Sequence, residues 1–219
     1  LLWTNNIMID QHNSLAEKFL KKGFWLYLFS FIIAPIAYVI KIIISWNITV
    51  EEIGILYGII SLITLLASYN DLWMTESLKH FIPKYITEKK YDKVKSVLFF
   101  ALFVQITTSL IIALFFFLWS DLIAQKYFKS DEAIEILKIF AFFFLWLNFF
   151  QTISHFFLAN QDTFFNKLSD LLRLWFILIS VLYVFFTDTS SLINYSYGWL
   201  VWLYIWLVFA IIIFIKKYY

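Results

Sequence analysis

Six long apolar stretches dominate this sequence and restrict its fold more than any other feature. A helix that crosses a bilayer needs about 20 mainly apolar residues, and six stretches reach or approach that length. They cover residues 24–45, 53–69, 96–120, 133–157, 168–186 and 194–215. A membrane-spanning strand would be only about 9–11 residues long and would alternate in character. The sequence therefore predicts an all-α, polytopic membrane protein with six transmembrane helices.

The composition agrees with this class of protein. Hydrophobic residues make up 63% of the chain and charged residues 15%, whereas soluble domains are about 45–50% apolar and about 25% charged. The net charge of +2 is small, so we interpret the basic residues as a topology signal and expect no nucleic-acid partner. The chain has no cysteine, and its three histidines are scattered. We therefore expect neither a metal site nor a cofactor.

The number of lysines differs between the segments that connect successive apolar stretches. Residues 18–22, 69–95 and 216–217 are basic, and residues 160–173 hold Lys167 and Arg173. Residues 46–52 and 187–191 contain no lysine or arginine, and residues 121–132 are mixed in charge. Basic connections stay on the cytoplasmic side. The pattern predicts a multi-pass protein of the cell (plasma) membrane with both termini in the cytoplasm. Residues 1–23 would form a cytoplasmic leader, irregular over residues 1–13, and residues 24–219 a six-helix transmembrane lobe.

The segment 69–95 is the longest polar stretch and carries the densest group of lysines. Four apolar side chains recur in it at helical spacing: Leu78, Phe81, Ile82 and Tyr85. This pattern predicts a short amphipathic helix on the inner leaflet, where lysines attract anionic headgroups. A basic loop that serves only topology is the alternative. Asp71 and Glu76, at the cytoplasmic end of the second span, are candidates for a cytoplasmic gate.

Polar residues inside the spans mark candidate binding positions, because a polar side chain that faces lipid is costly. Lys41 continues a face of small residues, and Arg173 lies three residues after Asp170. The fourth span carries one polar stripe that includes Asn148, Gln151 and His155. The alternatives are that Lys41 reaches the membrane interface, that Arg173 pairs with Asp170, and that the stripe makes hydrogen bonds between helices.

In the third span, Gln105 and Thr108 share a face near mid-membrane. We expect both side chains to contact other helices.

Three segments carry a resemblance to a known family. They read GFWLYLFSFIIAPIAYVIKIII at 23–44, EEIGILYGIISLITLLASYNDLWMTESLKHFIPKYI at 51–86 and KKYDKVKSVL at 89–98. This succession resembles the N-terminal lobe of polysaccharide flippases of the multidrug/oligosaccharidyl-lipid/polysaccharide exporter superfamily. The resemblance covers most of the chain, although the last two spans match only in general character.

The resemblance implies a transporter, not an enzyme, that flips a polyprenyl-pyrophosphate-linked oligosaccharide by alternating access. Lys41 and Arg173 would meet the pyrophosphate, and Asn148, Gln151 and His155 would contact the sugars. The implied partners are the lipid-linked oligosaccharide, membrane lipid and a second six-helix lobe, in the same full-length chain or in a dimer. We therefore expect the chain to be a fragment or, as the alternative, a half-transporter.

Other functions fit the sequence less well. A cation-coupled multidrug exporter of the same superfamily would want an acidic residue in mid-span, and none is present. A polymerase or ligase of polysaccharide assembly would want a large external loop with Arg and His, whereas these loops are short. A structural subunit without transport activity is a further alternative.

Trp73 departs from the family pattern. Similar proteins tend to read DLGL where this chain reads Asp71-Leu72-Trp73-Met74, and the chain has 10 tryptophans but only 4 glycines. We therefore hypothesise that Trp73 and Trp146 stand at UGA codons that the source organism reads as glycine. The codons at these two positions decide the question.

Overall fold

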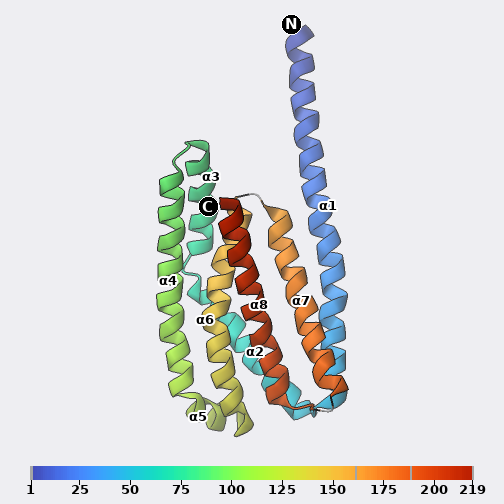
Figure 1. The fold of residues 1–219 in the computed structure, drawn as a ribbon, viewed down its shortest axis with the longest axis vertical. Coiled ribbons are helices and arrows are strands. Elements are labelled where there is room, and N and C mark those ends of the chain that lie inside the picture. Colours follow the sequence, from blue (N-terminus) through green and yellow to red (C-terminus); the bar gives the residue numbers. More distant parts are fainter. Residues whose placement is uncertain (1, 161, 188, 219) are drawn as a thin grey trace.

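The computed structural model describes residues 2–160, 162–187 and 189–218, and these residues form a bundle of helices without a strand (Figure 1). The elements are α1 (Leu2–Asn47), α2 (Val50–Asn70), α3 (Met74–Thr87), α4 (Tyr91–Leu118), α5 (Ser120–Ile123), the π-helix η1 (Ala124–Phe128), α6 (Glu132–Ala159), α7 (Thr163–Phe186) and α8 (Leu192–Tyr218). Six helices in this described part are long and apolar enough to cross a membrane. The all-α, polytopic fold is confirmed.

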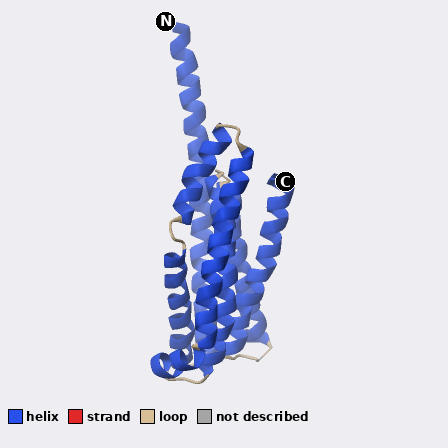
Figure 2. Ribbon diagram, turned by 90° about the vertical axis from the view of Figure 1, so that its left-hand side faces the viewer, coloured by secondary structure: helices blue, strands red, loops and turns tan. Residues whose placement is uncertain are grey.

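The bundle has two ends that are named here by what they contain. The η1 end holds the turn between α1 and α2 together with α5 and η1, and the hairpin end holds the turn between α3 and α4 at residues 88–90 (Figure 1). The first part of α1 projects past the hairpin end (Figure 2). The expectation of an irregular segment over residues 1–13 is wrong for residues 2–13, which belong to α1. No proline or glycine precedes Gly23, so nothing interrupts the helix there.

Helix α6 is the centre of the bundle. It packs against α2, α3, α4, α7 and α8, and 61% of its most apolar stretch is buried, against 22–39% for the other candidate spans. Phe140, Phe144 and Phe157 of α6 are almost fully buried. Around it, α1 packs along α7 while α2 packs on α6, and α1 and α2 make few contacts with each other. The two helices therefore diverge after the turn that connects them.

A break between α2 and α3 lies beside the middle of α4. Asn70 Nδ2 donates to Gln105 Oε1 and to Ser109 Oγ, both at 2.9 Å, and Gln105 Nε2 donates to the Asp71 carbonyl oxygen at 3.2 Å. Gln105 lies about 20 Å from either end of α4 at the helical rise per residue. The chain turns here through Leu72 (φ 44°) and Trp73 (φ 62°). Helix α3 then continues towards the hairpin end, antiparallel to α4 (Figure 1).

This arrangement corrects the expectation for α3. An amphipathic helix is present, but it packs lengthwise against α4 and α6 and buries Leu78, Ile82 and Thr75. Because the apolar face of α3 is buried against other helices, the helix does not require a leaflet surface to bury it. The expected interhelical contact of Gln105 is confirmed. The hydroxyl of Thr108, in contrast, donates to Val104 O of its own helix at 2.9 Å.

Candidate functional site

A cleft of about 350 Å³ opens where α1 and α2 diverge, and α6, α7 and α8 form its other walls. Its polar lining comes from Lys41, Tyr57, Thr64, Gln151 and Arg173, and most of the remaining lining is apolar, including Trp199 and Trp202. The cleft brings together three of the five predicted substrate-binding residues, Lys41, Gln151 and Arg173, from three different helices.

Lys41 enters the cleft beside an aromatic ring. Its Nζ lies 5.3 Å from the centroid of the Tyr57 ring, a cation–π contact between α1 and α2. Tyr57 itself also lines the cleft. No sequence signal identifies such a pair, because the two residues belong to different helices.

Arg173 has no bonding partner for its buried Nε. The alternative pairing of Arg173 with Asp170 is not formed, since Asp170 Oδ2 lies 3.6 Å from Lys167 Nζ. The indole Nε1 of Trp202, another lining residue, is also buried without a partner. Guanidinium and indole nitrogens are donors only. Among the described residues, two cations and no carboxylate line this cleft, so its chemistry suits an anion.

The other two predicted binding residues lie outside the cleft lining. Asn148 is 2% exposed, and its Nδ2 donates to Phe144 O of the preceding turn at 2.8 Å. His155 is half-buried one turn beyond Gln151, and its Nδ1 has no partner. His155 therefore lies on α6 between the cleft and the hairpin end.

The two candidate gate residues are both tied to α3. The Asp71 carboxylate accepts hydrogen bonds from the backbone N–H and the hydroxyl of Thr75, so it caps the start of this helix. Glu76 Oε1 accepts from Lys79 Nζ at 2.9 Å, and both side chains are exposed by more than a third. These contacts give Asp71 a structural role.

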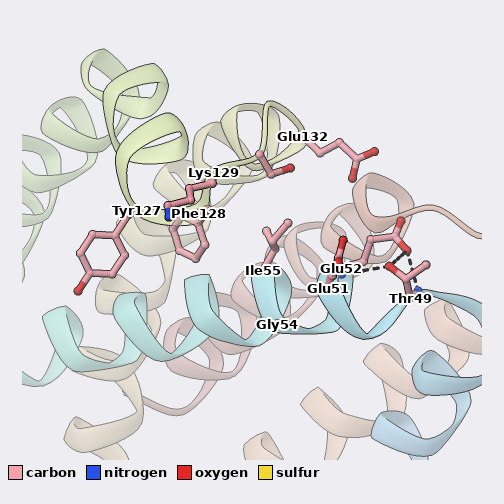
Figure 3. A pocket seen from close by; sticks show the side chains of 10 residues that line it. Thr49, Glu51, Glu52, Gly54, Ile55, Tyr127, Phe128, Lys129 and Glu132 are labelled. Carbon is pink, nitrogen blue, oxygen red and sulfur yellow. Dashed lines mark hydrogen bonds between the residues drawn. The ribbon is translucent and has the colours of Figure 1, made fainter.

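A second hollow, of about 790 Å³, lies at the η1 end between the start of α2 and the segment from η1 to α6 (Figure 3). Glu51, Glu52, Lys129 and Glu132 are among its lining residues. Glu52 is committed to a capping box, since its Oε2 accepts from Thr49 N at 2.7 Å. None of the predicted site residues lines this hollow. Within the described ranges, no cluster of three His, Asp or Glu side chains is placed to hold a metal ion.

Comparison with known proteins supports the class without giving an activity. No family model matches the chain, and no solved structure matches it. An uncharacterized membrane protein of Methanocaldococcus jannaschii, MJ1068, is 24% identical over 196 residues. The match covers 84% of this chain but only 39% of that relative. This similarity and the six apolar helices together support a multi-pass membrane protein.

Proposed function

We propose that this protein belongs to a flippase that moves polyprenyl-pyrophosphate-linked oligosaccharides across the cell membrane during cell-surface polysaccharide biosynthesis. The observation that carries the proposal is the donor-rich cleft, with Lys41 and Arg173 on the neighbouring helices α1 and α7 and no carboxylate among its described lining residues. A pyrophosphate offers acceptor oxygens and negative charge, which these side chains match.

The parts of such a cargo fit different parts of this surface. Lys41, Arg173 and the Trp202 indole N–H would hold the phosphates, while the Gln151 amide would bond sugar hydroxyls. The polyprenyl tail would remain in the bilayer, reached through the gap where α1 and α2 diverge. Beyond Gln151, His155 and Asp170 would extend the polar surface towards the hairpin end.

The lysines set the proposed orientation. The hairpin end would face the cytoplasm, because residues 84–95 contain five lysines and the connections at the η1 end are poor in basic residues. The cleft would lie between this six-helix lobe and a second one, and rocking of the lobes would expose it to each side in turn. The second lobe would come from a longer chain or from another copy. That this chain covers 39% of its relative agrees with either arrangement.

The cleft disfavours the alternative of a cation-coupled multidrug exporter. An organic cation or a coupling proton would call for a carboxylate, and the described residues that line the cleft include none.

Binding of a polyprenyl pyrophosphate to the purified chain in neutral detergent tests the proposal. Each charge-assisted contact is worth about 1.5–3 kcal/mol, so Lys41→Gln or Arg173→Gln should weaken binding by about 10–100-fold. Lys126→Gln, at an exposed position at the η1 end, should leave binding unchanged. Equal affinity of the double cleft variant and the unmodified chain would refute the proposal.

A further inference from the structure

An apolar groove of about 280 Å³ runs between α3 and α4, two helices that do not line the cleft. Most of its lining is carbon, from Met74, Leu78 and Phe81 of α3 and from Val97, Phe100 and Ala101 of α4. Phe100 is 61% exposed and Phe81 37%. Helices α3 and α4 are antiparallel between the α2–α3 break and the hairpin end (Figure 1). The α3 residues that line the groove run in that direction, from Met74 beside the break to Phe81.

A row of aromatic rings connects this groove to the lysines of the hairpin. The rings of Phe81 and Tyr85 stack with their centroids 6.0 Å apart, and Lys93 Nζ lies 5.6 Å from the centroid of the Tyr85 ring. The imidazole of His80 lies edge-on to Phe81, at 5.0 Å. Lys84 is exposed one turn beyond Phe81. The groove therefore ends at two lysines, one from each helix.

The charge around this end is strongly positive. Residues 84–95 contain five lysines against the two acids Glu88 and Asp92. Glu88 is already committed, because its Oε2 accepts from Lys90 Nζ at 2.7 Å. This bond lowers the pKa of Glu88 and raises that of Lys90, so both remain charged at neutral pH. A basic cluster beside a membrane-spanning helix attracts anionic headgroups.

We propose that an anionic phospholipid binds at this site, with one acyl chain in the groove between α3 and α4 and its headgroup phosphate between Lys84 and Lys93. The apolar groove and the cationic end are arranged in the order in which a phospholipid presents its chain and its headgroup. The direction of the groove, along the helices of a membrane bundle, is also that of an acyl chain. This site is independent of the cleft and of the cargo proposed for it.

Thermal unfolding of the purified chain in neutral detergent tests the site. Phosphatidylglycerol should raise the midpoint by several degrees, whereas phosphatidylcholine and soluble glycerol phosphate should have little effect. The double variant Lys84→Gln/Lys93→Gln should bind phosphatidylglycerol about 30-fold more weakly, as expected for two lysines at an anionic surface. Lys126→Gln, at the opposite end of the bundle, is the matched control and should retain the full effect.

A second variant tests the groove without changing the charge. Ser96 is an exposed lining residue, and Ser96→Trp would fill the groove from the outside. This variant should lose the stabilisation by phosphatidylglycerol while it keeps its midpoint in detergent alone. Stabilisation that survives both sets of changes, or equal stabilisation by phosphatidylcholine, would overturn the proposal.

Discussion

Replacement of Trp73 by glycine should stabilise the protein. Trp73 has φ 62° and ψ 14°, in the left-handed region, where a residue with a Cβ is strained by about 1–2 kcal/mol. Glycine adopts this conformation without that cost, but it loses roughly 0.4–1 kcal/mol more backbone entropy on folding. The indole is 79% exposed, so its removal costs little packing. The net gain should be about 0.5–1 kcal/mol.

The assay is thermal unfolding in detergent, followed by circular dichroism. For a chain of this length, 1 kcal/mol shifts the midpoint by about 2–4 °C, so Trp73→Gly should raise it by about 1–4 °C. Trp73→Ala is the matched control, because it also removes the indole but keeps the Cβ and therefore the strain. Alanine should leave the midpoint unchanged or lower it.

Two results would refute this reasoning. If Trp73→Ala stabilised the protein as much as Trp73→Gly, the gain would come from loss of the indole. If glycine lowered the midpoint, the turn would not be strained. Trp146 provides the contrast, since it lies within α6 and its ring packs against Tyr204 with centroids 5.4 Å apart. Trp146→Gly should therefore destabilise the protein, which makes Trp73 the stronger candidate for a recoded glycine.

Three further changes test the packing of the bundle. Gln105→Leu removes one of the two acceptors of the buried Asn70 amide and should cost about 1–3 kcal/mol in chemical unfolding; changing both residues to Leu should recover part of the loss. Gly198→Ala places a Cβ 3.0 Å from that of Ser180, so it should cost about 1–3 kcal/mol by overpacking, and Ser180→Gly should restore stability if that contact is the cause. Thr49→Ala removes the capping box of α2 and should lower stability by about 1 kcal/mol, while an unchanged midpoint would show that the cap contributes nothing.

The six spans were predictable because each depends only on length and local hydrophobicity. The end of α2 near residue 69 and an amphipathic helix after it were predicted as well, but the packing of that helix against α4 and α6 was not, because its lysines indicated the membrane surface. Leu78 and Ile82 of α3 are buried where this helix packs against α4 and α6. A single sequence does not show which helices become neighbours.

The candidate site was predictable in part. Periodicity placed Asn148 and Gln151 on one stripe of α6, but three residues turn a helix by about 300° and so leave them on adjacent rather than identical faces. Gln151 consequently reaches the cleft, while Asn148 bonds its own backbone. The contact between Lys41 and Tyr57 depends on how α1 and α2 diverge, and no local sequence pattern predicts that arrangement.

The position of α3 implies an order of events during synthesis. Glu76, Lys79 and Lys84 make α3 a poor candidate to enter a bilayer alone, since charged residues oppose insertion. Much of its buried face packs on α6, which the ribosome makes only after the whole of α4 and η1. The packing of α3 can therefore be completed only after α6 has been synthesised. The break at Leu72 and Trp73 would allow α2 to insert into the membrane before α3 has packed.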